Sequence, residues 1–233
     1  MKFYWGETFT ELTPILLGGL GVVIEITVIS FILFMLIASV LGVGAVIAPK
    51  PIRVMIAFIT EIIRGTPALV QIFYIYYVIP TAYAYIRSLF TGSVVYPDMP
   101  SIAAGIAGLS ICYGCYVAEV IRSAILNIDY GQTEAGLALG FTKTQVLFKI
   151  VFPQAMKNSV PVFGNYLVML VKDTSILQAI AVPELLLKTR TYASKTFFTI
   201  ESYTLVALFY LAISLPLSRL VKYLEKKTKI SRS

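Results

Sequence analysis

The sequence predicts an all-α integral membrane protein with about five transmembrane helices. Hydrophobic residues make up 58% of its 233 residues, only 13% are charged, and the mean hydropathy is +0.84. Soluble domains are about half apolar and about a quarter charged. The apolar residues come in long runs without strict alternation, which disfavours a membrane β-barrel. This leaves α-helices, in which the backbone N–H and C=O groups are hydrogen-bonded within the segment, as lipid requires.

Five apolar stretches are long enough to cross a bilayer, which takes roughly 20 helical residues each. They cover residues 16–47, 52–79, 101–125, 159–182 and 203–224. We expect an aromatic, amphipathic lead over residues 1–14 and a polar connection over residues 183–199. The sequence predicts one transmembrane domain over residues 1–233.

The basic residues indicate how the chain is oriented. The net charge is +7, but Lys and Arg gather at the ends of the spans instead of covering one polar face, so we expect no nucleic-acid partner. More of them fall on the side that carries residues 131–153 and the C-terminal tail. Because Lys and Arg are enriched in cytoplasmic segments, we expect the loop and the C-terminus in the cytoplasm and the N-terminus outside.

Several kinds of chemistry lack the side chains that they need. The chain has no His, which rules out a Ser/His/Asp set. Leu137 stands where a phosphate-binding loop starting at Gly131 would need its Lys. Cys112 and Cys115 have CxxC spacing without further metal ligands, and we interpret them as packing residues. We therefore expect no catalytic residues, no metal site and no cofactor bound by this chain.

The second span contains two charges next to a helix-breaking sequence. Glu61 and Arg64 are three residues apart on one helical face, and Gly65-Thr66-Pro67 follows. Pro67 lacks an N–H and disfavours helix at the residue before it, so the helix is expected to loosen there and free backbone carbonyls. Broken helices at membrane depth are tolerated where they line a cavity. The pattern fits a site for a zwitterion, and it equally fits a structural ion pair.

Other ionisable residues also fall inside the spans, where such residues are costly and mark substrate pathways by default. Glu25 has the outer interface as its alternative location, and Glu119 has Arg122, three residues on, as an alternative partner. Lys172 and Asp173 are neighbours in the sequence. Adjacent helical residues point about 100° apart, so only one of the two can face a pathway.

The most polar loop covers residues 131–153. A turn at Asp129-Tyr130-Gly131 opens it, a short helical run follows, and Gly140 breaks that run. A second amphipathic run over residues 142–151 is expected to end at Pro153. The loop is either an ordinary connection on the membrane surface or a docking element for a partner protein.

This loop resembles the EAA loop of ABC-importer permeases. That pattern runs Glu-Ala-Ala, three residues, Gly, nine residues, Ile, any residue, Leu-Pro, and here Glu134-Ala135-Gly136, Gly140 and Ile150-x-Phe152-Pro153 have the same spacing. Gly136 replaces the second Ala and is expected to soften the first helix, and Phe152 replaces Leu. The resemblance implies a role in coupling to an ATPase for Gln132, Glu134, Ala135, Gly136, Gly140 and Pro153.

Motifs along nearly the whole chain are similar to the polar amino-acid branch of ABC permeases, the histidine, glutamine, arginine and cystine uptake group. They are Glu61-x-x-Arg64-Gly65-Thr66-Pro67, Glu119-x-x-Arg122, Gly131-Gln132-x-Glu134-Ala135, Phe152-Pro153-Gln154-Ala155 and Lys172-Asp173-Thr174-Ser175. The substrate path that this resemblance implies is made of Glu61, Arg64, Gly65, Thr66, Pro67, Gln71, Glu119, Lys172, Asp173, Thr174 and Ser175.

The same resemblance implies the rest of the assembly. It predicts a type I ABC-importer permease core in the bacterial cytoplasmic (inner) membrane, paired with a second copy or a paralogue. ATPase subunits would bind ATP and Mg, an extracytoplasmic substrate-binding protein would deliver an amino-acid substrate, and lipid would surround the spans.

Two other classes of protein are the alternatives. An ion-coupled secondary amino-acid transporter would also use intramembrane carboxylates, but no inverted repeat of two halves is visible in the sequence. A membrane scaffold or sensor would not need a charged helix break. Acids outnumber bases in the second to fourth spans, which favours cationic or neutral substrates. Which amino acid is carried, and whether the pair is homo- or heterodimeric, is left open.

Overall fold

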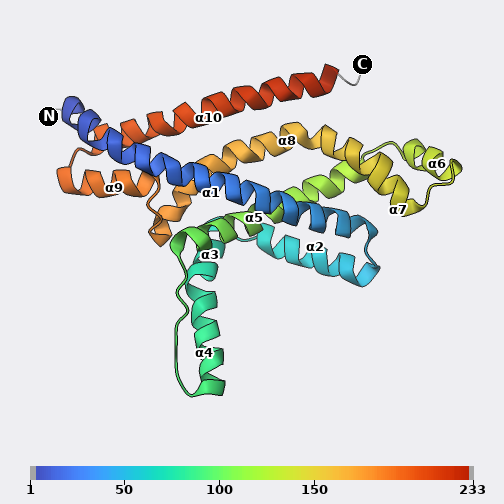
Figure 1. Cartoon of the computed structure of the whole chain (residues 1–233), viewed down its shortest axis with the longest axis horizontal. Coiled ribbons are helices and arrows are strands. Elements are labelled where there is room, and N and C mark those ends of the chain that lie inside the picture. Colours follow the sequence, from blue (N-terminus) through green and yellow to red (C-terminus); the bar gives the residue numbers. More distant parts are fainter. Residues whose placement is uncertain (1–3, 231–233) are drawn as a thin grey trace.

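The computed structural model describes residues 4–230 and the side chains of residues 4–226. Every regular element in this part of the chain is helical (Figure 1): α1 (Trp5–Ile47), α2 (Lys50–Arg64), α3 (Ala68–Phe73), α4 (Ile79–Thr91), α5 (Ser101–Leu126), α6 (Tyr130–Ala138), α7 (Lys143–Val146), α8 (Phe152–Asp173), α9 (Leu185–Thr196) and α10 (Thr199–Ile230). The π-helical segments η1 (Tyr74–Val78) and η2 (Leu147–Val151) join α3 to α4 and α7 to α8, and the 3₁₀ segment η3 (Thr174–Ile180) follows α8.

Five helical stretches within the described residues are long and apolar enough to cross a membrane: Trp5–Ile47, Ala68–Thr91, Ser101–Leu126, Lys143–Ile180 and Thr199–Lys226. This confirms the all-α class and the number of spans. The second stretch lies later than residues 52–79 because the chain breaks before α3. Figure 1 shows α3 against α5 and α4 projecting from the body, crosswise to α1 and α5.

Helix α5 lies at the centre of the packing. Its buried face takes part in one apolar cluster with residues of α1, α3, α8 and η3. Small residues allow the helices to approach closely, as is usual between membrane helices. A Cβ on Gly42 of α1 would lie 2.7 Å from the Ala118 carbonyl oxygen, and one on Gly114 of α5 would lie 2.6 Å from Ile37 Cγ2. The α1–α5 contact therefore depends on glycine on both sides.

The expectation of a separate amphipathic segment over residues 1–14, ahead of the first span, was wrong. Residues 1–3 lie outside the described part, but α1 already begins at Trp5 and runs through Pro14. An interior proline removes one helical hydrogen bond. Here Leu12 and Leu16 are completely buried in a cluster with Leu185 of α9. Tertiary packing of this kind is what stabilises most helices, and it keeps the segment helical despite the proline.

The polar connection over residues 183–199 includes a helix that the sequence did not predict, α9, which is capped by the side chain of Glu184. One expectation about the polar loop was wrong. The second run of the polar loop does not end at Pro153, because η2 leads directly into α8. Pro153 stands in the first turn of α8, the position where a missing N–H is tolerated in a helix. The π-helical register of η2 separates that turn from α7.

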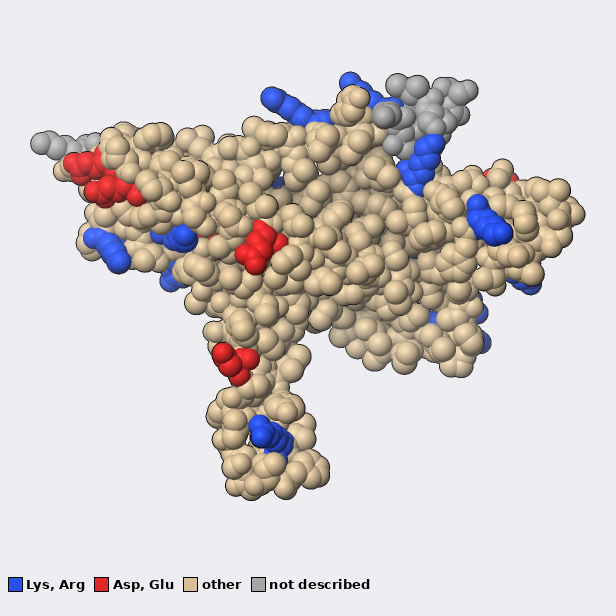
Figure 2. All heavy atoms as spheres, in the orientation of Figure 1, with Lys and Arg blue, Asp and Glu red and all other residues tan. Residues whose placement is uncertain are grey.

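The helices place α9 and the α6–α7 region at opposite ends of the molecule (Figure 1). Most of the charged side chains on the face in Figure 2 gather toward these ends or on the projecting α4 region. The surface between the ends is largely uncharged, as a lipid-facing surface requires.

Candidate functional site

The helix break predicted from Pro67 is confirmed. Helix α2 ends at Arg64, and Pro67 has extended backbone angles (φ −61°, ψ 138°) before α3 begins. The freed carbonyls accept hydrogen bonds from side chains. Gln71 Nε2 donates to the carbonyl oxygens of Ile63 (2.6 Å) and Thr66 (2.9 Å), and the Tyr116 hydroxyl donates to that of Arg64 (3.1 Å). Side chains thus hold the broken backbone in one geometry.

A pocket of about 470 Å³ lies beside this break, between α1, α2 and α5. Four charged residues are among those that line it: Glu61, Arg64, Glu119 and Arg122. Arg122 and Glu119 form a two-pronged ion pair, with Nε to Oε2 at 2.9 Å and Nη2 to Oε1 at 2.6 Å. Each member of that pair therefore already has its partner.

The other two charges of the pocket are not paired with each other. Among the described side chains, Glu61 and Arg64 show no ion pair, although they share a helical face. The Arg64 guanidinium lies over the ring of Tyr116, with Cζ 5.7 Å from the ring centroid, a contact that attracts a cation to the π-system. One carboxylate and one guanidinium thus line the pocket with free hydrogen-bonding capacity.

Two tyrosines of α5 connect this pocket to the motif at the end of α8. Tyr113 and Tyr116 are three residues apart and so share a helical face. The Tyr113 hydroxyl donates to Asp173 Oδ2 at 2.6 Å, and its ring meets that of Tyr166 edge-on with centroids 5.9 Å apart. Asp173 is therefore not a lining residue of the pocket but lies along the same face of α5.

We name residues 129–153 the elbow. Its turns and helix caps are formed by residues that lie close together in the sequence. Asp129 caps α6 by accepting from the Gly131 N–H (2.7 Å). The helix ends in a Schellman motif, in which Gly140 N–H donates to the Leu137 carbonyl (3.0 Å) and Phe141 N–H to that of Gly136 (3.1 Å). The left-handed φ of Gly140 (+85°) suits glycine, which has no Cβ to clash.

The second half of the elbow starts with a capping box. The Thr142 hydroxyl accepts from the Gln145 N–H, and the Gln145 side chain accepts from the Thr142 N–H (3.3 and 2.9 Å). Helix α6 runs without a break through Gly136. A Cβ there would lie 2.7 Å from Val146 Cγ2 and 2.9 Å from an Ile150 methyl group, so glycine lets α6 pack on the second half.

Similarity to known proteins covers most of the chain, including the elbow. Residues 35–230 match the protein family described as "Binding-protein-dependent transport system inner membrane component". The chain belongs to this family. The permease is 34% identical over 184 residues to the L-cystine transport system permease protein TcyB of Bacillus subtilis, covering 79% of this chain and 73% of that protein.

Other relatives extend over the whole permease. The glutamine transport system permease protein GlnP of Escherichia coli is 30% identical over 230 residues, which cover 99% of this chain and 100% of that one. Among solved structures, the "Crystal structure of an amino acid ABC transporter with histidines" has a TM-score of 0.83 and 28% identity, covering 97% and 100% of the two chains. An inward-facing MetNI methionine ABC transporter, at 19% identity, shares the fold (TM-score 0.69; coverage 91% and 97%).

The other residues predicted from the sequence lie in the elbow, in the helix break and at the end of α8. In the elbow of the permease, Glu134 and Ala135 are exposed, and Gln132 accepts from Gln154 Nε2 of α8 (3.3 Å). In the break, the Thr66 hydroxyl turns back to the Ile62 and Ile63 carbonyls (3.2 and 3.1 Å).

The residues of the Lys172-Asp173-Thr174-Ser175 motif differ in how exposed they are. Lys172 is exposed, Ser175 is half-buried, and Thr174 is completely buried with its hydroxyl donating to the Val171 carbonyl (2.8 Å). The structure therefore brings Glu61, Arg64 and Glu119 into one pocket but leaves Lys172–Ser175 outside it.

Sequence reasoning missed a second polar cluster, at the α9 end. Glu184 is completely buried and accepts hydrogen bonds from the N–H groups of Leu186 and Leu187 (2.9 and 2.8 Å) and from the Tyr210 hydroxyl (2.6 Å). Burial raises the pKa of Glu184, and the three hydrogen bonds oppose that rise. Acidic residues are favourable near helix N-termini, so Glu184 could have indicated the start of α9, but its capping role has no sequence signature.

Proposed function

We propose that this permease is the membrane subunit of an ABC importer that carries polar amino acids across the bacterial cytoplasmic membrane. The observation that carries the proposal is the elbow: a rigid, doubly capped turn with exposed Glu134 and Ala135 at one end of the spans. The names of the relatives support amino acids as the substrate class.

The energy would come from ATPase subunits in trans. Helices α6 and α7 form the end of the molecule that is farthest from α9 (Figure 1), and the basic residues argue for placing that end in the cytoplasm. ATPase closure would push on the elbow, and η2 would carry the movement into α8 without an intervening loop. A second permease copy or a paralogue would complete the translocation path.

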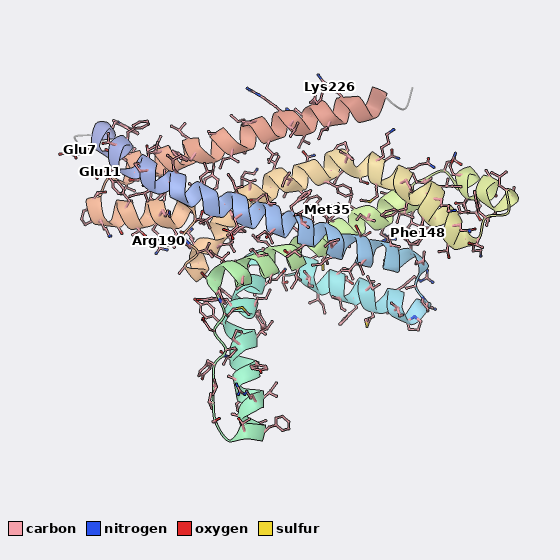
Figure 3. The ribbon with its side chains drawn as sticks, in the orientation of Figure 1. Glu7, Glu11, Met35, Phe148, Arg190 and Lys226 are labelled. Carbon is pink, nitrogen blue, oxygen red and sulfur yellow. The ribbon has the colours of Figure 1, made fainter. Side chains whose placement is uncertain are left out.

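The opposite end would meet an extracytoplasmic substrate-binding protein. Glu7 and Glu11 of α1 and Arg190 of α9 lie there together (Figure 3), and all three side chains are exposed. Exposed charges of both signs suit a transient, electrostatically steered contact. The N-terminus would then lie outside and the C-terminus inside.

The substrate would be recognised by its two charges. Arg64 presents a planar fork that binds a carboxylate through two parallel hydrogen bonds, and Glu61 would meet the ammonium group in the same pocket. Asp173, outside the pocket, would meet the ammonium group further along the path. Gln71 Oε1 is buried without a hydrogen-bond partner among the described residues, and a substrate N–H would satisfy it. The pocket volume of about 470 Å³ falls within the usual range for small-molecule sites.

Two conservative substitutions test this site. Arg64→Lys keeps the charge but loses the fork, and Asp173→Asn removes the charge while keeping an acceptor for Tyr113. We expect each to reduce uptake about ten-fold or more, the effect of losing one charged hydrogen bond. The measurement is uptake in vesicles that contain the ATPase subunits and the binding protein, with Arg87→Lys on the projecting α4 as the matched control.

Normal assembly together with wild-type uptake in both variants would place the substrate site elsewhere. Loss of uptake in the Arg87→Lys control to the same degree would contradict the assignment as well, because Arg87 is exposed far from the pocket.

A further inference from the structure

Glu184 is a buried charge that neither the pocket nor the elbow uses. Its side chain is 0% exposed, and three donors converge on its two oxygens. Oε1 accepts from the Leu187 N–H, and Oε2 accepts from both the Leu186 N–H and the Tyr210 hydroxyl. A carboxylate taken out of water is costly unless it is fully hydrogen-bonded. The three hydrogen bonds favour the ionised form, which accepts all of them, and they oppose the burial that raises the pKa of this carboxyl group.

The hydrogen bond from the Tyr210 hydroxyl to Glu184 joins α10 to α9. Glu184 belongs to the N-terminus of α9, whereas Tyr210 lies within α10. Only residues 181–183 separate Glu184 from η3, and in this link the Val182 N–H donates to the Leu177 carbonyl of η3 (3.2 Å) and the Glu184 N–H donates to the Val182 carbonyl (2.8 Å). We name Glu184 and Tyr210 the Glu184 cluster. The cluster ties α9 to α10, and the short link ties the cap of α9 to η3.

Segment η3 connects the cluster to the proposed substrate path. Its first residue, Thr174, directly follows Asp173, whose carboxylate accepts from Tyr113 (2.6 Å). The Tyr113–Asp173 bond therefore holds the residue that precedes η3, and the link through Val182 holds the other end of η3 to the cap of α9. A shift of η3 would move Asp173 relative to the face of α5 that carries Tyr113.

Helix α9 is also attached to α1, at points separate from the cluster. Lys188 Nζ donates to the Ile15 carbonyl (3.3 Å), and the Tyr192 hydroxyl donates to Glu11 Oε2 (2.8 Å). Gly19 gives α9 room on α1, because a Cβ there would lie 3.1 Å from the Leu185 nitrogen. Helix α9 thus contacts both α1 and α10.

We propose that Glu184 and Tyr210 are positioning residues for transport, which hold α9 in register with η3 so that a contact made on α9 reaches Asp173. This rests on the proposed function, in which the binding protein meets the α9 end. A displacement of α9 then either breaks the Glu184–Tyr210 bond or moves α10 and η3 with it. Hydrogen bonds to ionised groups are about twice as strong as neutral ones, so the second course is favoured.

The decisive variant is Tyr210→Phe, which removes one hydroxyl and leaves both backbone caps on Glu184 in place. Tyr203→Phe is the matched control, because Tyr203 lies on the same helix with its side chain exposed. Each permease is reconstituted in vesicles with the ATPase subunits. ATPase activity is measured alone and with increasing concentrations of substrate-loaded binding protein, and amide hydrogen exchange is followed over residues 174–180.

We expect Tyr210→Phe to assemble normally and to keep the ATPase rate measured without binding protein. Its stimulation by the binding protein should fall about ten-fold, and exchange in η3 should accelerate by a similar factor, since one charged hydrogen bond is lost. The control should match the wild type in both measurements. Glu184→Gln should reproduce the loss, and the double variant should be no worse than Glu184→Gln alone, because both changes break the same bond.

Three results would overturn the inference. Wild-type stimulation of Tyr210→Phe means that the bond transmits nothing, whatever its effect on exchange. Failure of Tyr210→Phe to assemble means that the bond serves folding only. Equal losses in Tyr203→Phe mean that the effect is not specific to the cluster. A wild-type complex that does not respond to any binding protein would instead contradict the proposed function, so the two failures are distinguishable.

Discussion

Gly140 is the residue of the elbow whose substitution has the most predictable physical effect. Its φ of +85° lies in the left-handed region, and no atom lies within 4 Å of a Cβ placed on it. The cost of Gly140→Val is therefore backbone strain and not a clash with neighbours. Placing an L-residue in the left-handed conformation costs about 1–2 kcal/mol, and a β-branched side chain costs more.

That strain acts on the geometry between α6 and α7. A penalty of about 1.4 kcal/mol shifts an equilibrium ten-fold, and the two Schellman hydrogen bonds to Leu137 and Gly136 are lost if the turn relaxes. We expect Gly140→Val to insert into the membrane normally, to retain less ATPase subunit on purification, and to reduce uptake in vesicles at least ten-fold.

Gly92→Val is the matched control for this variant. Gly92 also has a left-handed φ, +69°, and a Cβ placed on it would likewise have no atom within 4 Å, but it follows α4, far from the elbow. It carries the same backbone strain without touching the coupling region, so uptake should stay near the wild-type rate. Equal uptake in the two variants, with equal amounts of bound ATPase, would refute the coupling role of the elbow.

Further predictions concern packing, the helix break and orientation. Gly42→Val should lower the thermal midpoint of the purified permease, because its side chain would meet the Ala118 carbonyl at 2.7 Å or less; an unchanged midpoint would contradict the tight α1–α5 contact. Gln71→Leu removes the side-chain donor that reaches the carbonyls of both Ile63 and Thr66 across the break, where one hydrogen bond contributes about 0.5–1.5 kcal/mol, and should impair uptake; wild-type uptake would show that the break is held by other contacts. In a cysteine-free background, a membrane-impermeant thiol reagent should label Arg190→Cys and not Thr144→Cys in intact cells; the opposite pattern would reverse the orientation.

The parts of the fold that local chemistry determines were predictable from the sequence. Pro67 lacks a donor and restricts Thr66, and the break occurs there. Gly140 and the Thr142 cap have local signatures, and the elbow turns at these residues. The five spans followed from apolar length alone. In each case the deciding residues are within a few positions of the feature that they produce.

The features that were predicted wrongly, or not predicted, depend on contacts between residues that are far apart in the sequence. Pro14 and Pro153 are both tolerated because tertiary packing or a change of helical register accommodates them. The roles of Tyr113 and Tyr116 depend on Asp173 and Arg64, which lie far away in the sequence. Charges inside the spans and motif positions predicted the path residues, whereas the aromatic residues that connect the charges have no local signature.

The source of energy for transport is the point that tests the account most directly. Vesicles containing the permease, the ATPase subunits and the binding protein should accumulate a radiolabelled polar amino acid only when ATP is present on the side of the elbow. Dissipating the proton and sodium gradients should leave the initial rate unchanged. Uptake by the permease alone, driven by an ion gradient without ATP, would contradict the account and identify a secondary transporter.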